Sequence, residues 1–170
     1  MRTTGRNSPL RDAIRATCPE REAELDLALF TGMRRGEQFT LKWADVHRDQ
    51  GYLEVHGKTG RRQVQTNAKT FEAIEQLRKR RTDSDFVCTE TQRDGQADWR
   101  RWFEKAVKAA GIRNFHWHDL RHTFCSRELI SGLDIRTVQK LAGHASIVTM
   151  TKYAHLSPEH LREAAKKIGG

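Results

Sequence analysis

Three short segments in the second half of the chain, 118–122, 141–144 and 151–155, carry residues that suit the transfer of a phosphodiester to a tyrosine. They read His-Asp-Leu-Arg-His, Leu-Ala-Gly-His and Thr-Lys-Tyr-Ala-His. A phenol with a pKa near ~10 is a poor nucleophile at neutral pH. Attack on phosphorus therefore needs a base, cations on the phosphate oxygens and an acid for the leaving oxygen. The upstream segments 31–37 and 57–60 add arginine and lysine to this set.

The first half of the chain reads as two helices followed by a small β region. A proline at a first helical position, glutamates after it and an apolar face that ends at a glycine predict a helix over 19–32. Arg34 then falls at the junction with a second short helix through 39–43. The segment 46–65 alternates short apolar runs with turns, which predicts a β-meander with a tight hairpin at Lys58.

The second half reads as a succession of helices bounded by capping residues and glycines. The expected helices are one capped by Asn67 that ends in the basic run 78–81, one from Trp99 to Gly111, one over 118–129, one from Asp134 to Gly143, one from Ser146 to near Tyr153, and a last one from Ser157. On the third of these, His118 and Arg121 lie one turn apart on the same face.

Composition favours a nucleic-acid partner. Thirty-one Lys and Arg against 22 Asp and Glu give the 170 residues a net charge of +9, which suits nucleic acid before a membrane surface. Cys18, Cys88 and Cys125 are odd in number and form no Cys-x-x-Cys pair, which argues against a disulfide framework or a zinc ribbon and indicates the reducing cytoplasm. No stretch approaches ~18 apolar residues, so neither a signal peptide nor a membrane span is predicted.

The order and spacing of these segments resemble the tyrosine recombinases, also called phage integrases, over nearly the whole chain from Pro19. In that family, Thr-Gly-x-Arg carries a first catalytic arginine, a hairpin carries a lysine, His-x-x-Arg carries a histidine and a second arginine, and Gly-His precedes a nucleophile in Tyr-Ala-His. The catalytic residues that the resemblance implies are Arg34, Lys58, His118, Arg121, His144 and Tyr153, the last as nucleophile. The sequence departs from the family pattern at Gln38 and Ala142, where leucine is common, without losing a reactive group.

The resemblance also implies a fold and partners. The expected fold is that of the DNA breaking-rejoining catalytic domain, α+β, mainly α-helical with a small three-stranded antiparallel sheet. The expected division is a polar segment over 1–18 and an integrase catalytic domain over 19–170, with the family's N-terminal core-binding domain absent from this chain. The expected partners are double-stranded DNA and other protomers in a DNA-assembled tetramer, contacted through a C-terminal helix over 157–168.

Physical chemistry assigns roles that agree with this resemblance. The planar forks of Arg34 and Arg121 suit the non-bridging oxygens of a phosphodiester. His118 takes the phenol proton or holds the phosphate, His144 donates to the phosphate oxygens, and Lys58 protonates the leaving 5′ oxygen. The product is a 3′-phosphotyrosine that keeps the energy of the broken bond, so neither a metal ion nor another cofactor is required.

Two other functions stay open at this point. His116, His118, Asp119 and His122 form a cluster of imidazoles and a carboxylate that would suit a metal-dependent phosphohydrolase, although no second acidic box completes a coordination sphere. The other alternative is a non-catalytic DNA-binding relative, whose basic surface binds DNA while Tyr153 takes part in no reaction.

Overall fold

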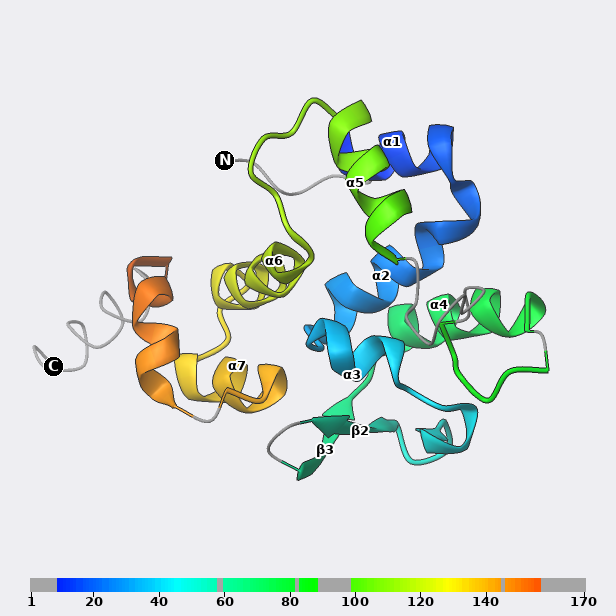
Figure 1. The fold of residues 1–170 in the computed structure, drawn as a ribbon. Coiled ribbons are helices and arrows are strands. Elements are labelled where there is room, and N and C mark those ends of the chain that lie inside the picture. The colour runs from blue at the N-terminus through cyan, green and yellow to red at the C-terminus, as the bar shows by residue number, and fades with distance from the viewer. Residues whose placement is uncertain (1–8, 58–59, 82, 89–98, 145, 157–170) are drawn as a thin grey trace, which may run out of the picture.

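In the computed structural model, a small sheet lies at one side of a mainly helical molecule (Figure 1), and the structure describes residues 9–57, 60–81, 83–88, 99–144 and 146–156. The elements in chain order are α1 Pro9–Thr17, the 3-10 helix η1 Pro19–Arg21, α2 Glu22–Thr31, α3 Arg35–Phe39, the 3-10 helix η2 Trp43–Asp45, β1 Val46–His47, β2 Tyr52–Gly57, β3 Gly60–Gln65, α4 Ala68–Lys79, α5 Trp99–Ala109, α6 Trp117–Ile130, α7 Ile135–Ala142 and the 3-10 helix η3 Ile147–Leu156. None of the helices in this part of the chain is long and apolar enough to span a membrane.

The sheet confirms the predicted meander. Its strands are antiparallel in the order β1-β2-β3, and Gly57 pairs with Gly60 at the end of the β2–β3 hairpin. Leu53, Val55 and Val64 are at most 1% exposed and belong to the core cluster that also contains α2 and α4 side chains. Every second strand residue therefore faces the helices, as expected for a sheet with one buried face.

Helix α1 occupies part of the segment 1–18, for which the sequence predicts a polar opening. Leu10, Ala13 and Ile14 are buried in it, and their i, i+3, i+4 spacing places them on one helical face. That face packs against α5. In the sequence, polar and basic residues stand between Leu10, Ala13 and Ile14, so this short apolar pattern is difficult to recognise. The domain boundary near residue 19 stays a prediction.

The helix boundaries near the site follow the predicted capping residues. Asn67 accepts a hydrogen bond from the backbone N–H of Thr70 at 3.0 Å, and Asp134 accepts from the backbone of the first turn of α7. Two predicted helices differ in form. The one expected through 39–43 ends at Phe39, because the chain then turns and pairs with the 86–87 segment, and the one before Tyr153 is a 3-10 helix. The predicted helix 157–168 lies outside the described residues.

An aromatic cluster fixes α3 against α6. Phe39, the last residue of α3, packs on Trp117, the first residue of α6, with ring centroids 5.1 Å apart. Trp99 and Phe103 of α5 contact the same tryptophan, at 5.7 and 5.0 Å. Since Arg34 precedes α3 and Arg121 lies on α6, this apolar packing sets the distance between the two arginines.

Candidate active site

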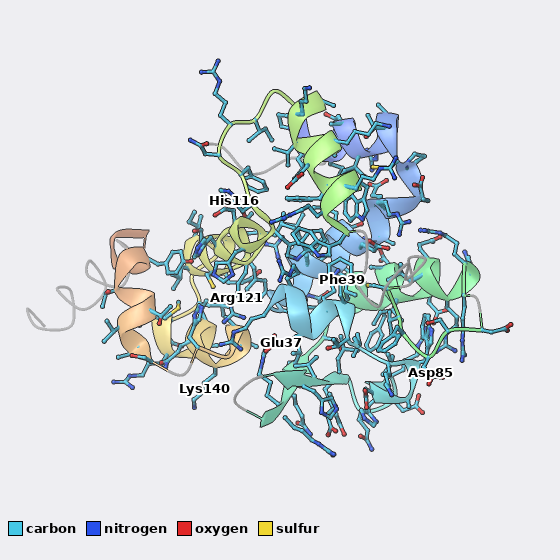
Figure 2. All side chains as sticks on the ribbon, viewed as in Figure 1. Glu37, Phe39, Asp85, His116, Arg121 and Lys140 are labelled. Carbon is cyan, nitrogen blue, oxygen red and sulfur yellow. The ribbon has the colours of Figure 1, made fainter. Side chains whose placement is uncertain are left out.

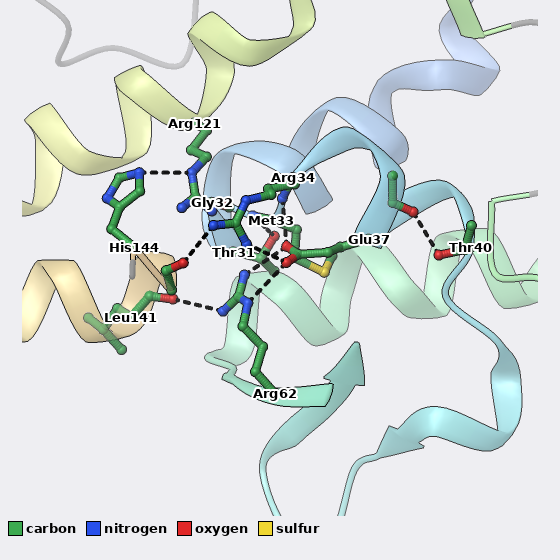
Figure 3. A network of polar contacts seen from close by, with 12 residues as sticks. Thr31, Gly32, Met33, Arg34, Glu37, Thr40, Arg62, Arg121, Leu141 and His144 are labelled. Atoms are coloured by element: carbon green, nitrogen blue, oxygen red, sulfur yellow. Dashed lines mark hydrogen bonds and ion pairs between the residues drawn. The ribbon is translucent and has the colours of Figure 1, made fainter. Parts of the chain in front are cut away.

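Three chain segments bring the predicted arginines and a histidine together (Figure 3). Arg34 is the N-cap of α3, Arg121 lies in the second turn of α6, and His144 follows the residue that caps α7. Figure 2 shows Glu37 and Arg121 near the centre of the molecule, where α3, α6 and α7 approach one another. The sequence prediction that Arg34, Arg121 and His144 share one site agrees with this arrangement.

Arg34 is held by one carboxylate and one carbonyl. Its backbone N–H donates to Glu37 Oε2 at 2.8 Å, and its Nη1 donates to Glu37 Oε1 at 2.8 Å. Its Nη2 donates to the carbonyl of Gly143 at 2.8 Å. The side chain keeps 38% of its surface exposed, so the guanidinium is fixed in direction and still open to solvent on one side.

Arg121 is the more deeply buried of the two arginines, with 2% of its surface exposed. Its Nη1 donates to the carbonyl of Gly32 at 2.7 Å and its Nε donates to His144 Nε2 at 3.2 Å. Its Nη2 is buried and has no hydrogen-bond partner among the described residues. Burial, followed by repulsion from Arg34 and Arg62, lowers the pKa of Arg121 to about 10, which leaves it charged at neutral pH.

Two glycines with positive φ supply the carbonyls that hold the arginines. Gly32 caps α2 at φ +60°, and Gly143 caps α7 at φ +70°. A Cβ on Gly32 would lie 2.4 Å from the ring of Phe124, and one on Gly143 would lie 2.6 Å from Nε of Arg62. Glycine is therefore needed at both positions for its backbone conformation and for the close approach of a neighbour.

His144 supports Arg121 in this structure. Because a guanidinium only donates, His144 Nε2 accepts from Arg121 and the ring proton belongs on Nδ1. Nδ1 lies 3.0 Å from the sulfur of Met150. In this tautomer His144 orients Arg121 through Nε2, and that nitrogen does not make the expected donation to a phosphate. That role stays a prediction.

Tyr153 lies in the apolar cluster formed by α6, α7 and η3, and is 5% exposed. Its hydroxyl is hydrogen-bonded to Nδ1 of His122. Burial first, and the neighbouring Cys125 second, raise the pKa of Tyr153 well above the usual value of a phenol, while Arg121 acts in the opposite direction. The phenol is therefore fully protonated at neutral pH and needs a base before it can attack.

His118 reaches the tyrosine through a second histidine. The ring of His118, an exposed residue, meets the ring of His122 edge to face with centroids 4.7 Å apart, and His122 contacts Tyr153. Sequence reasoning assigns His122 only to the alternative metal cluster, and so misses this contact. The i, i+4 spacing of the two histidines on one helix is the available signal.

Lys58 lies outside the described residues. The hairpin that carries it is described on both sides, at Gly57 and Gly60. A Cβ on Gly57 would lie 3.3 Å from Oε1 of Glu37, so the β2 end of the hairpin adjoins the carboxylate that holds Arg34. The role of Lys58 as general acid stays a prediction.

Arg62 is a residue of the site that is not predicted from the sequence. The spacing of Glu37 predicts a salt bridge to Arg34 alone, whereas the structure shows that it also binds Arg62. Glu37 is 2% exposed and accepts from Arg62 as well as from Arg34. Burial raises its pKa, but hydrogen bonds from Arg62 and the Arg34 backbone outweigh burial, so the pKa lies below the usual value. The alternation that places Arg62 on the same strand face as buried Val64 is the signal in the sequence.

The alternative metal cluster does not assemble. His116 is the N-cap of α6 and lies 3.6 Å from Asp119, whereas His122 faces Tyr153. In the described part of the chain, the one group of at least three potential ligands whose atoms all lie within 4.8 Å is Asp45, Glu54 and His56. The cluster on α6 therefore gives the phosphohydrolase alternative no geometric support.

The fold and this set of residues define a catalytic domain of the tyrosine recombinase class. The chain belongs to the phage integrase family, whose sequence model matches residues 9–160. It is 34% identical over 151 residues to tyrosine recombinase XerA of Pyrococcus furiosus, and the aligned region covers 81% of this chain and 50% of that protein. It is 29% identical over 163 residues to the integrase of Salmonella phage P22, covering 85% and 41%.

A solved structure confirms the fold. The crystal structure of XerA recombinase superposes with a TM-score of 0.72 at 29% identity, covering 94% of this chain and 61% of that one. Both the predicted family and the predicted α+β class with its three-stranded antiparallel sheet are thus confirmed. The chain spans about half the length of the curated relatives it matches.

Proposed function

We propose that this chain cleaves and rejoins DNA through a 3′-phosphotyrosine intermediate, as the catalytic part of a site-specific recombinase or integrase. One observation carries the proposal. The guanidinium of Arg121 is buried beside that of Arg34, and its Nη2 has no partner among the described residues. A buried N–H group without a hydrogen-bond partner, next to a second positive charge, suits an anion as ligand. A phosphodiester has two non-bridging oxygens, which can accept hydrogen bonds from two guanidinium groups.

Tyr153 is the proposed nucleophile. Its phenol oxygen forms a bond to phosphorus while the bond from phosphorus to the 5′ oxygen breaks, and the 5′ oxygen takes a proton from Lys58. The phenol proton passes to the histidine pair on α6, of which His122 contacts the hydroxyl in the present position of the tyrosine and His118 is the exposed member. Rejoining is the reverse reaction, in which a 5′ hydroxyl attacks the phosphotyrosine.

The nucleophile has to leave its present position before it reacts. Tyr153 is 5% exposed and packs among the side chains of α6 and α7. A phosphodiester of duplex DNA cannot enter that cluster, so the η3 segment has to move and bring the phenol to the oxygens held by Arg34 and Arg121. This step gives the chain an unreactive state and a reactive state.

The proposed partners follow from charge and family. The net charge of +9 favours double-stranded DNA through phosphate contacts, and we infer assembly with other protomers on that DNA through the segment 157–168, which lies outside the described residues. Cys18, Cys88 and Cys125 form no disulfide among the described residues, which suits action in the cytoplasm.

Covalent trapping tests the proposal. The chain is incubated with a pool of fluorescent, nicked duplexes of randomised sequence, so that cleavage next to the nick releases a short strand and leaves the protein attached. Denaturing electrophoresis then separates the protein–DNA adduct, whose sequence identifies a preferred site. The unchanged chain is expected to form the adduct. Tyr153→Phe is expected to form none while it retains its fold and its duplex affinity.

Each alternative function has its own outcome. An adduct of equal yield from Tyr153→Phe would assign the nucleophile to another residue. Duplex binding without any adduct would favour the non-catalytic DNA-binding relative. Strand cleavage without an adduct that stops on addition of a chelator would favour the phosphohydrolase.

A further inference from the structure

Arg62 of β3 joins the sheet to two other parts of the site. Its Nε and Nη2 donate to Oε1 and Oε2 of Glu37 at 3.2 and 2.8 Å. Its Nη1 donates to the carbonyl of Leu141, near the end of α7, at 3.4 Å. Its guanidinium also lies against Gly143, where it fills the space that a Cβ would take. Figure 3 shows this side chain rising from the sheet between α3 and α7.

Arg34 is hydrogen-bonded to the same two parts of the site, the Glu37 carboxylate and the turn at the end of α7. Glu37 Oε1 accepts from Arg34 Nη1 and from Arg62 Nε, and Glu37 Oε2 accepts from the Arg34 backbone and from Arg62 Nη2. The α7 turn likewise gives one carbonyl to each arginine, that of Gly143 to Arg34 and that of Leu141 to Arg62. The position of Arg34 therefore depends on two groups that Arg62 also holds.

The shared carboxylate also affects the charge that Arg34 presents. Glu37 is buried and ionised, and one carboxylate between two guanidiniums leaves a net positive charge in the group. Without Arg62, Glu37 would neutralise Arg34 alone. An arginine that stabilises charge developing on a phosphate needs a fixed direction and an uncompensated charge, and Arg62 contributes to both.

We propose that Arg62 is a positioning residue for strand cleavage, acting through Glu37 and the α7 turn to hold Arg34 toward the phosphodiester without itself touching the reacting atoms. This inference rests on the proposed function of the site. It assigns the β3 strand a part in the chemistry that is separate from the lysine at the hairpin tip.

The neighbouring residue on β3 provides a matched control. Arg61 is 72% exposed and pairs only weakly, at 3.4 Å, with Glu54. Arg62→Gln and Arg61→Gln each remove one positive charge from the same strand, so both should weaken salt-dependent binding to duplex by a similar amount. Only Arg62→Gln disturbs Glu37 and the α7 turn. At saturating duplex, a weaker affinity for DNA no longer limits the rate of adduct formation. A lower rate in Arg62→Gln than in Arg61→Gln under that condition therefore indicates a positioning role of Arg62.

The measurement is a single-turnover rate of adduct formation on one nicked duplex recovered from the trapping pool, with duplex affinity measured by fluorescence anisotropy. Arg62→Gln is expected to slow adduct formation at saturating duplex by at least about tenfold, since a displacement of ~1 Å in a catalytic group costs up to about 10²-fold in rate. Arg61→Gln is expected to leave that rate unchanged. Arg62→Lys should recover part of the rate, because it keeps the charge and loses the fork.

A double substitution tests the route through Glu37. In a Glu37→Gln background, changing Arg62 to Gln should slow the reaction by a smaller factor than it does in the unchanged chain, since the effects of residues in one network are not additive. The slowing that remains measures the route through the α7 turn. If a thermal melt shows that Arg62→Gln does not fold, the saturating rates of adduct formation of Arg62→Lys and Arg61→Lys are compared instead.

Three results would contradict the proposal, and each contradicts a different part of it. Equal saturating rates for the variants at positions 61 and 62, with a normal adduct from the unchanged chain, overturn the positioning role alone. A full additional effect of Arg62→Gln in the Glu37→Gln background overturns the route through Glu37. Failure of the unchanged chain to form any adduct overturns both the proposed function and the role of Arg62 in it.

Discussion

The hydroxyl of Tyr153 is hydrogen-bonded to the ring of His122, which follows Arg121 directly on α6. One helix thus holds the arginine proposed to bind the phosphate and, on the next residue, the side chain that contacts the proposed nucleophile. Arg121 points toward α2 and the α7 turn, and His122 points toward η3. The two proposed functions of the site, binding the phosphate and activating the tyrosine, are separated by the ~100° that one residue turns in a helix.

Tyr153 should make the stability of the fold sensitive to alkaline pH. Its pKa is raised by burial, so the folded chain keeps the phenol proton where the unfolded chain, with a pKa near ~10, loses it. The stability due to this proton is fully present below pH ~10 and declines above it, by at most ~1.4 kcal/mol per pH unit. Denaturant unfolding of the unchanged chain and of Tyr153→Phe between pH 8 and 11 checks this. A constant difference between the two across that range would contradict it.

Glu37 should give the opposite dependence at acid pH. Its pKa is lowered by hydrogen bonds from Arg62 and Arg34, which outweigh the effect of burial. The stabilisation from its charge is therefore present above the unfolded value of ~4.3 and is lost as pH falls through the lower folded value. Unfolding free energies of the unchanged chain and of Glu37→Gln should differ at pH 7, and the difference should shrink as pH falls below ~4.3. A difference that stays constant from pH 7 down to the acid limit of the folded state would show that the ionised form is not what stabilises the fold.

Replacing either site arginine by lysine should slow adduct formation by about 10²–10³-fold, the usual effect of removing one donor to a developing oxyanion. Lysine keeps the charge of Arg34 or Arg121 and loses the planar fork that reaches two partners at once. Arg35→Lys is the control, because Arg35 is exposed and lies over the ring of Trp99 at 4.6 Å. Loss of rate in Arg35→Lys with a normal rate in Arg34→Lys would move the first arginine of the site by one residue.

A methyl group on Gly143 should impair the reaction more than the fold. Gly143→Ala costs roughly 1–2 kcal/mol for its left-handed backbone and forces the guanidinium of Arg62 away from its present position. Gly111→Ala meets the same backbone cost at φ +66° with no atom within 4 Å of the new methyl. Both variants should lose similar stability in thermal melts, and only Gly143→Ala should lose adduct formation. Equal activity in the two would show that Arg62 tolerates displacement.

The framework of the site is readable from the sequence, because single residues mark its boundaries. Gly32 and Gly143 end helices in the left-handed conformation, and Asn67 and Asp134 begin them. Such signals act over a few residues, so one sequence shows them. They are sufficient to place Arg34 at a junction between two helices.

Contacts between distant segments could not be predicted in the same way. Arg61 and Arg62 are adjacent and chemically identical, and only their alternation with Val64 indicates that Arg62 faces inward. That Arg62 meets Leu141 there is a property of how α7 packs on the sheet. The apolar face of α1 is similarly short, with Leu10 and Ile14 among charged residues, and only its packing on α5 makes it part of the core.

The carbonyls of Gly32 and Gly143 connect opposite ends of the described chain, since Arg121 reaches back 89 residues to the first and Arg34 reaches forward 109 residues to the second. Closing loops of that length is a late and entropically costly event in folding. During synthesis, Arg34 is made long before Arg121 and Gly143, so a nascent chain that ends before them lacks both the second arginine and the carbonyl that holds the first. The proposed binding of a phosphodiester by these two arginines is thereby coupled to completed folding of the domain.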